Sequence, residues 1–199
     1  MPILGITGGI ATGKTTFRKL LLQRIEAEFF DADACARVLL DEDEAVREEI
    51  LQRIHPAAYD AEGKPDRALI RELVYQDAAR KSTLEAILHP VIRDRWSRKA
   101  LAARQEDRMF IVDIPLLFET KAESLFDHII VVACSHQIQL ARMAERGLSV
   151  EISEKIIASQ MPIGVKMKGA HHVIWNDGLP EGLTTQADLF SVYLHARYG

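Results

Sequence analysis

Residues 8–15 read Gly8-Gly9-Ile10-Ala11-Thr12-Gly13-Lys14-Thr15 and match the pattern GxxxxGK[ST]. An apolar run at residues 3–7 precedes this stretch, and apolar residues at helical spacing follow it over residues 17–25. The pattern therefore lies between a predicted strand and a predicted helix, which is the context of a phosphate-binding loop. Glycine lets the backbone turn its N–H groups toward phosphate oxygens, and the positive end of the helix points at the same anion. The stretch predicts an α/β protein that binds a nucleotide.

The residues of this loop have separate expected tasks. Lys14 should reach the β- and γ-phosphates, Thr15 should coordinate Mg²⁺ through its hydroxyl, and Thr16 should contact an inner phosphate. The residues expected to contact the nucleotide are Gly9, Ile10, Ala11, Thr12, Gly13, Lys14, Thr15 and Thr16. The loop indicates nucleotide binding but does not define a reaction, so the chemistry has to be found elsewhere in the chain.

The composition of the 199 residues argues against several partners. A formal net charge of −4 gives no bulk attraction to a nucleic-acid backbone, so phosphate recognition has to be local. No apolar run approaches the roughly 20 residues of a membrane-spanning helix, and residues 1–5 leave no room for a cleavable signal. Cys35 and Cys134 have no metal or redox spacing. We expect a cytoplasmic protein without a nucleic-acid or membrane partner, as a monomer or a weak homo-oligomer.

Four further segments favour buried strands of a parallel sheet. Residues 29–31, 109–112, 128–132 and 172–175 are short runs rich in β-branched or aromatic residues. Together with residues 3–7 they predict a five-stranded parallel sheet. After the predicted strand at residues 128–132, Ser135 is expected to cap a helix that runs through Arg146 and ends at Gly147. A further helix is expected to run through Gln160 and to stop at Pro162.

Residues 41–96 have an almost wholly helical pattern. Helices are expected to start at Asp43, Asp66 and Ser82, and Ser82 is expected to form a capping box with Glu85. Pro90 is expected to mark a helix start or a kink. The region predicts a helical insertion at about residues 41–100 within a single domain that spans residues 1–199.

Two classes of nucleotide-binding protein fit the chain poorly. A GTPase needs a base-reading Asn-Lys-x-Asp element, which the sequence lacks. A nucleic-acid motor normally needs a longer chain and a basic surface, whereas this chain is short and acidic. A small anionic partner is therefore favoured over a nucleic acid.

An ordered set of short motifs runs along nearly the whole chain. The motifs are Thr7-Gly8-Gly9-Ile10, Asp31-Ala32-Asp33 followed by Ala36-Arg37, Gly63 with Asp66-Arg67, His89-Pro90, Pro115-Leu116-Leu117-Phe118-Glu119, and Gln139 with Arg142. In this order they resemble the dephospho-CoA kinase family, from Ile3 to about Asn176. The ordered combination, rather than any single motif, makes the resemblance specific.

The resemblance implies a P-loop NTPase three-layer fold, with a helical CoA-binding insertion near residues 41–100 and a mobile lid near residues 136–165. It implies that ATP, with Mg²⁺, donates its γ-phosphoryl group to the ribose 3′-hydroxyl of dephospho-CoA, which is the last step of coenzyme A biosynthesis. Two alternatives remain open. One is another small-molecule kinase of this architecture, such as a nucleoside monophosphate kinase, and the other is a nucleotide-binding regulator without kinase activity.

Two aspartates of one motif receive different roles. Asp33 falls where the family has the carboxylate that faces the acceptor hydroxyl, which implies a general base. Asp31, expected on the same face of the strand as Asp33, is expected to support magnesium or the loop geometry. For either residue the alternative is a cap for the following helix.

Three more residues are assigned by the resemblance to the donor side. Arg142 corresponds to the lid arginine, whose guanidinium would offset charge on the transferring phosphoryl group. Without the resemblance, Arg142 would be read as part of a solvated helix face. Asp113 ends a predicted strand and resembles a magnesium-binding acid opposite Thr15. Asn176 lies near the segment where the family has its adenine contacts.

The acceptor is assigned by the resemblance to a set of residues spread along the chain: Thr7, Asp33, Arg67, His89, Pro115 and Leu116. Simpler roles exist for some of them. Arg67 would also fit an ion pair with Asp66 at a helix start, His89 a structural role, and Leu116 the hydrophobic core.

The chain departs from the family pattern in two places. Ala11 stands where the family usually has Gly, and its methyl group is expected to be tolerated if φ stays negative there. Residues 161–171 also differ from the family pattern, which weakens the assignment of adenine contacts near Asn176.

Overall fold

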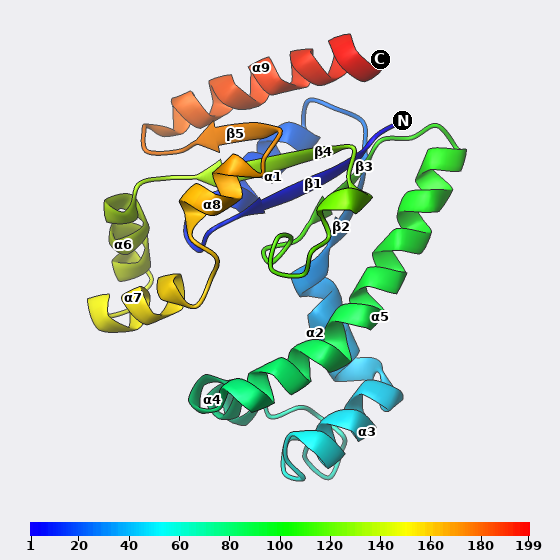
Figure 1. Cartoon of the computed structure of the whole chain (residues 1–199), viewed down its shortest axis with the longest axis vertical. Coiled ribbons are helices and arrows are strands. Elements are labelled where there is room, and N and C mark those ends of the chain that lie inside the picture. Colours follow the sequence, from blue (N-terminus) through cyan, green and yellow to red (C-terminus); the bar gives the residue numbers. More distant parts are fainter. The chain divides into compact units, whose positions relative to one another are not determined.

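A five-stranded sheet forms from short, largely apolar segments in the order β2-β3-β1-β4-β5 (Figure 1). The strands are β1 (Ile3–Gly8), β2 (Glu28–Asp31), β3 (Phe110–Asp113), β4 (His128–Ala133) and β5 (His172–Trp175). Strand β1 runs parallel to β3 and β4, and β4 runs parallel to β5. Every residue of β1, β3 and β4 is buried, which explains why their sequences do not alternate with polar residues. The predicted five-stranded parallel sheet is confirmed.

The computed structural model describes residues 1–199, and the chain divides into two units. The first unit consists of Met1–Phe30 and Ala100–Gly199, and the second of Asp31–Lys99.

Two helices cover one face of the sheet in the first unit. They are α1 (Lys14–Leu22) and α9 (Pro180–Tyr198), which pack against each other and against the strands (Figure 1). Leu4 and Ile6 of β1 point into this layer and share a core with Phe17 of α1 and with Phe190 and Leu194 of α9. The sequence patterns did not identify α9, although its apolar residues complete this core.

The opposite face of the sheet receives the alternate residues of β1. The hydroxyl of Thr7 donates to the carbonyl oxygen of Pro115 at 3.0 Å, in the segment that follows β3. Helix α8 (Ile163–Lys168) lies on this side against β4 (Figure 1). The sequence patterns did not identify α8, because it is only six residues long.

Two helices after β4 begin at serine caps. Helix α6 (His136–Glu145) begins after Ser135, whose hydroxyl accepts from the N–H of Ile138, and the chain turns at Gly147 with φ +80°. Helix α7 (Val150–Ala158) begins after Ser149 in the same way. The predicted helix from Ser135 to Gly147 is confirmed. The second predicted helix also forms, but it ends at Ala158 rather than at Gln160, and Pro162 directly precedes α8.

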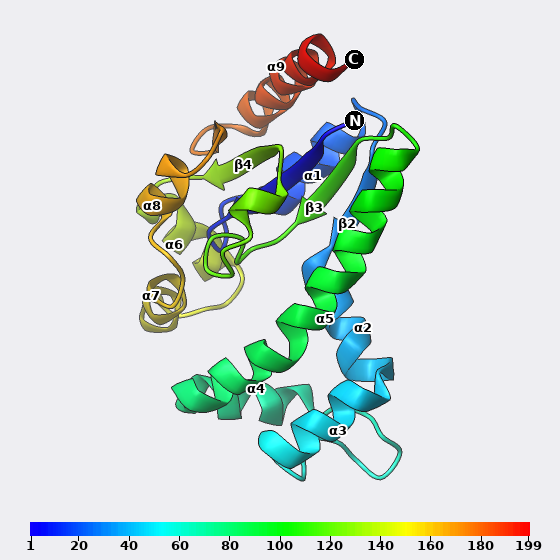
Figure 2. The same ribbon diagram turned by 45° about the vertical axis from the view of Figure 1, so that its right-hand side comes forward.

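The second unit consists of helices around a core of its own (Figure 2). The helices are α2 (Ala32–Glu42), α3 (Glu44–Arg53), α4 (Arg67–Gln76) and the part of α5 (Ala78–Gln105) up to Lys99. The buried residues of this core are Leu39, Val46, Ile50, Ile54, Ala58, Tyr59, Ile70, Ile87 and Leu88. The helical region expected at residues 41–100 lies almost wholly in this unit.

Two of the three predicted helix starts in this unit are confirmed. Asp43 accepts from the N–H of Val46 at 3.2 Å, and Asp66 accepts from the N–H groups of Ala68 and Leu69. These aspartates cap α3 and α4 by the expected mechanism.

The predicted helix start at Ser82 is wrong. Helix α5 begins at Ala78, where the carboxylate of Asp77 accepts from the N–H groups of Ala79 and Arg80, so Ser82 lies inside the helix. The capping-box pattern also occurs within helices, and the competing cap at Asp77 precedes it. Pro90 likewise lies inside α5 rather than at a start.

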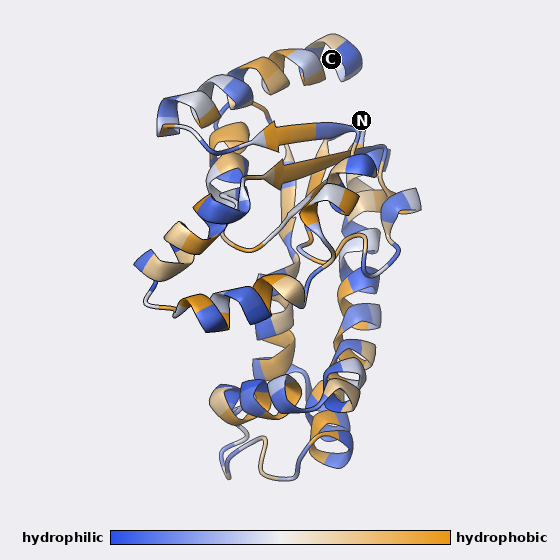
Figure 3. Cartoon of the chain, turned by 60° about the vertical axis from the view of Figure 1, so that its left-hand side comes forward, coloured by the Kyte–Doolittle hydropathy of each residue, from blue (hydrophilic) through white to orange (hydrophobic).

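The hydropathy of the chain follows this arrangement. Figure 3 shows that the strand arrows are mostly hydrophobic, whereas most helices have both hydrophobic and hydrophilic stretches. None of the helices combines the length and the apolar character that a membrane span requires.

A buried histidine lies at the start of β4. The side chain of His128 is 3% exposed, and its Nε2 is buried without a hydrogen-bond partner. The rings of His171, His172, Phe190 and Tyr193 lie with their centroids 5.1 to 6.4 Å from its own. Burial lowers the pKa of His128 to about 4, with further lowering by His171, His172 and Arg197.

Protonation of His128 therefore opposes folding. The folded protein keeps His128 neutral, whereas the unfolded chain takes up its proton near pH 6.5, so stability falls as the pH drops from about 6.5 toward 4. We expect the free energy of unfolding to be lower at pH 5 than at pH 8 by about 2 kcal/mol from this group. Urea unfolding at the two pH values measures the difference.

Replacement of the histidine tests the assignment. His128→Leu should reduce the pH 5 to pH 8 difference by about 2 kcal/mol, the contribution of this group, whereas His136→Gln, at an exposed histidine of α6, should keep the difference. A His128→Leu protein with the full pH dependence would contradict the assignment.

Candidate active site

The stretch between β1 and α1 forms the turn that the sequence predicted. Gly13 caps α1 in the left-handed conformation, with φ +93°, and Lys14 is the first residue of the helix. The N–H groups of Thr12, Gly13 and Lys14 donate to no acceptor within the protein. Free N–H groups at the positive end of a helix form an anion-binding site.

The carbonyl groups of the same turn are held by side chains from distant parts of the chain. Gln139 of α6 donates to the carbonyl of Ile10 at 2.8 Å, and Arg142 of α6 donates to that of Ala11 at 3.2 Å. Asn176, directly after β5, donates to the carbonyl of Thr12 at 2.9 Å. Because the carbonyl oxygens are turned toward these donors, the N–H groups of the turn are left for an anion.

The interpretation of Arg142 as part of a solvated helix face is wrong. Besides Ala11, its guanidinium donates to the carbonyl oxygen of Asn176 at 2.9 Å, and the side chain is half-buried. Arg146, one turn later, is exposed. Arg142 therefore lies at the phosphate loop.

Lys14 and Asp113 form an ion pair at the edge of the loop. Asp113 ends β3 and is 2% exposed, and its carboxylate also accepts from Arg18 of α1 at 2.9 Å. The guanidinium of Arg18 lies over the ring of Phe29, 4.3 Å from its centroid. Arg18 was not among the predicted site residues. Its spacing from Lys14 places both on one face of α1, but its contact with Asp113, 95 positions away, has no local signal in the sequence.

The residues present fit magnesium only in part. Thr15 is exposed in the first turn of α1, and a hydroxyl beside phosphate oxygens is a ligand set that Mg²⁺ accepts. Both oxygens of Asp113 already have cationic partners, so its carboxylate fits a role through a water molecule better than direct coordination. No cluster of three or more His, Cys, Asp or Glu side chains offers a metal site of its own.

The segment after β3 contains the remaining acceptor-side residues of this unit. Pro115 and Leu116 are half-buried, whereas Leu117 and Phe118 are buried in the core. Thr7 is fully buried, and its hydroxyl is engaged by Pro115. Thr7 therefore holds the segment at Pro115 in place through this hydrogen bond.

In the second unit, Asp31 and Asp33 have different structural positions. Asp31 is the last residue of β2, and its carboxylate accepts from the N–H of Ala34 at 2.8 Å, so the capping alternative is confirmed for this residue. Asp33 lies in the first turn of α2 and is exposed. The expectation that both share one face of a strand is wrong, because the chain turns into a helix at Ala32.

Arg67 and His89 also lie in the second unit. Arg67 binds both carboxylate oxygens of Asp41, at 2.7 and 2.8 Å, so its expected alternative pair with Asp66 is not formed. Asp66 instead caps α4. Burial lowers the pKa of His89, which keeps its ring neutral at pH 7.

The expectation that φ stays negative at Ala11 is wrong. Ala11 has φ +58°, in the left-handed region that favours glycine, and its side chain is 8% exposed. The conformation is held by Gln139, Arg142 and Asn176, which donate to the carbonyls of Ile10, Ala11 and Thr12. A strained residue persists where its surroundings determine its conformation, as they do here.

Known proteins resemble this chain in sequence and in fold. The sequence model of a family described as dephospho-CoA kinase matches residues 2–181. A dephospho-CoA kinase of Fusobacterium nucleatum is 34% identical over 189 residues, which cover 94% of this chain and 96% of the relative. A solved structure from Thermus thermophilus has a TM-score of 0.77 at 35% identity, covering 98% of this chain and 97% of that one. A dephospho-CoA kinase structure from Campylobacter jejuni has a TM-score of 0.67 at 27% identity, with 97% of each chain covered.

The strain at Ala11 leads to a stability prediction. Ala11→Gly should raise the free energy of unfolding by about 1 kcal/mol, because glycine adopts the left-handed conformation without the clash of a Cβ. Urea unfolding measures the change. As a matched control, Ala141→Gly in the exposed middle of α6 should lower stability by about 1 kcal/mol. Destabilisation by both replacements would contradict the assigned strain.

The neighbouring glycine leads to a prediction about nucleotide binding. A Cβ at Gly13 would lie 2.1 Å from Nδ2 of Asn176, which holds the carbonyl of Thr12. Gly13→Ala should therefore weaken the affinity for Mg²⁺–ADP by more than about tenfold, a loss that calorimetric titration measures. Gly147→Ala, at φ +80° with nothing within 4 Å, should lose stability but bind normally. Equal affinity of the two variants would refute the prediction.

Proposed function

The chain belongs to the dephospho-CoA kinase family, and we propose that Lys14, Asp33 and Arg142 perform its transfer of the γ-phosphoryl group from ATP to dephospho-CoA. The acceptor is the 3′-hydroxyl of the ribose, and the product is coenzyme A. The observation that supports this assignment most strongly is the phosphate loop, whose carbonyl groups are held by Gln139, Arg142 and Asn176 while its N–H groups stay free.

The donor side is built from the loop and its ion pair. The free N–H groups of the loop bind the phosphates, and Lys14 moves from Asp113 to a phosphate oxygen when the nucleotide binds. Arg18 stays on Asp113, so this buried carboxylate keeps a cationic partner throughout. Arg142 lies beside the loop and stabilises negative charge on the transferring group.

We propose Mg²⁺ as the cofactor, held by the hydroxyl of Thr15 and by phosphate oxygens, with Asp113 acting through a water molecule. When bound, the ion neutralises charge on the β- and γ-phosphates. Thr16 contacts an inner phosphate, and Asn176 fixes the loop and lies near the adenine.

The acceptor side is proposed from the resemblance and from the character of its residues. Asp33 has an exposed carboxylate, which suits a general base for the ribose hydroxyl. Arg67 provides a cation for the acceptor's pyrophosphate, and neutral His89 provides a hydrogen-bond donor. Thr7, Pro115 and Leu116 contribute a wall. Residues 41–100 are proposed as the CoA-binding insertion and residues 136–165 as the lid.

We also propose a cellular location, an oligomeric state and a partner class. The protein is cytoplasmic, acts as a monomer or a weak homo-oligomer, and has no nucleic-acid partner. The acidic net charge of −4 supports the last of these statements.

An acceptor panel tests the activity. ADP release from Mg²⁺–ATP should depend on dephospho-CoA, and nucleoside monophosphates or the absence of an acceptor should give only background release. Asp33→Asn keeps the shape of the side chain but not its basicity, so turnover should fall by about 10²–10⁴-fold. Lys14→Ala should reduce both ATP binding and turnover.

Asp94→Ala is the matched control for Asp33, because Asp94 is an exposed aspartate of the same unit that pairs with Arg98. Its turnover should equal that of the wild type. ADP release without dephospho-CoA would contradict the activity, and an active Asp33→Asn protein would contradict the proposed base.

A further inference from the structure

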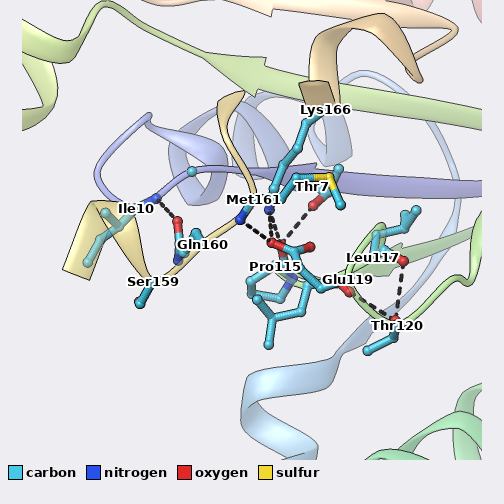
Figure 4. A network of polar contacts seen from close by, with 12 residues as sticks. Thr7, Ile10, Pro115, Leu117, Glu119, Thr120, Ser159, Gln160, Met161 and Lys166 are labelled. Carbon is cyan, nitrogen blue, oxygen red and sulfur yellow. Dashed lines mark hydrogen bonds and ion pairs between the residues drawn. The ribbon is translucent and has the colours of Figure 1, made fainter. Parts of the chain in front are cut away.

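Lys166 of α8 is completely buried, although it has a charged side chain. Its exposure is 0%, and its ammonium group donates to the carbonyl of Pro115 at 2.9 Å and to the carboxylate of Glu119 at 2.8 Å (Figure 4). A buried charge is tolerated only with such partners, so Lys166 fixes α8 to the segment that follows β3.

The two acceptors of Lys166 each bind a second donor. The carbonyl of Pro115 also accepts from the hydroxyl of Thr7, at the end of β1. The same oxygen of Glu119 that binds Lys166 also accepts from the N–H of Met161 at 3.0 Å. Met161 belongs to the connection between α7 and α8, so the Lys166–Glu119 pair determines where this connection lies.

Gln160, which precedes Met161 in this connection, contacts the phosphate loop. The side-chain oxygen of Gln160 accepts from the N–H of Ile10 at 3.0 Å (Figure 4). The carbonyl of Ile10 is bound by Gln139. Two glutamines from different segments therefore fix both polar groups of Ile10, directly before the strained Ala11.

We propose that Gln160 is a positioning residue for the donor nucleotide and that the buried pair Lys166–Glu119 holds it in place. By binding the N–H of Ile10, Gln160 fixes the peptide that precedes Ala11 and so keeps the following N–H groups directed at the phosphates. The proposal rests on the function proposed above, because it deepens the account of the same phosphate site.

Lys166 itself is not a phosphate ligand in this arrangement. Its ammonium group is fully buried and donates to Pro115 and Glu119, whereas Lys14 is partly accessible beside the loop. Lys166 therefore acts through Gln160, and its loss should affect nucleotide binding only as far as Gln160 is released.

The test measures Mg²⁺–ADP affinity by calorimetry in the full-length chain. Gln160→Leu keeps the bulk but removes the acceptor oxygen, and it should weaken affinity by about 3- to 10-fold, the effect of one hydrogen bond. The KM for ATP should rise by a similar factor, while the KM for dephospho-CoA stays constant. Lys168→Met removes an exposed lysine of the same helix and should change none of these values.

A double-mutant cycle tests the role of the buried pair. Lys166→Met should weaken ADP affinity in the wild-type background but not further in the Gln160→Leu background, because it acts through Gln160. If Lys166→Met does not fold, Glu119→Gln replaces it in the cycle. Additive effects would overturn the assigned role of the pair.

Failure of the positioning role can be distinguished from failure of the proposed function. Unchanged ADP affinity in Gln160→Leu, or equal increases in both KM values, would overturn the positioning role and leave a purely structural one. Absence of dephospho-CoA-dependent ADP release in the wild type would instead refute the proposed function. ADP titration does not require turnover, so it decides the role of Gln160 in either case.

Discussion

A chain that binds phosphate with its own N–H groups has to place the carbonyl groups of the same peptides elsewhere. Each peptide has one donor and one acceptor, and both need partners when they are buried. Here the carbonyls of Ile10, Ala11 and Thr12 are bound by side chains from α6 and from the end of β5. The anion site therefore depends on residues more than 120 positions away along the chain. The orientation of the loop peptides, with N–H groups toward the anion, is therefore a property of the folded unit, since the loop alone cannot supply donors for its carbonyl groups.

The parallel sheet explains how such distant residues reach the loop. Strands β1, β4 and β5 are neighbours, and their carboxyl ends meet at one edge. The phosphate loop follows β1, α6 follows β4, and Asn176 follows β5. Ligands bind at this edge of open parallel sheets because the connecting segments converge there. The positive φ of Ala11 is tolerated at this place, because several independent hydrogen bonds hold the surrounding peptides.

Local patterns in the sequence predicted the parts of the structure that depend on local physics. The phosphate loop, all five strands and the caps at Asp43, Asp66 and Ser135 could be predicted, because each has a short-range signal. Ser82 has the same cap signal but lies within α5, where an earlier cap at Asp77 prevails. The sign of φ at Ala11 and the contacts of Arg18, Gln160 and Lys166 involve residues far apart in the chain. No periodicity or spacing in a single sequence reports such contacts.

The two buried lysine–carboxylate pairs differ in a way that explains which lysine can move. Asp113 has a second cation, Arg18, so the departure of Lys14 does not leave this carboxylate alone in the interior. Lys166 has no comparable freedom, because its departure would leave Glu119 without a cation and the carbonyl of Pro115 with one donor fewer. Removing one partner of a buried pair costs about 3–5 kcal/mol, so only the pair with a replacement cation can exchange partners readily. Lys14, which we propose to move to the phosphate, therefore belongs to the pair that has a second cation, whereas Lys166 belongs to the pair that has none.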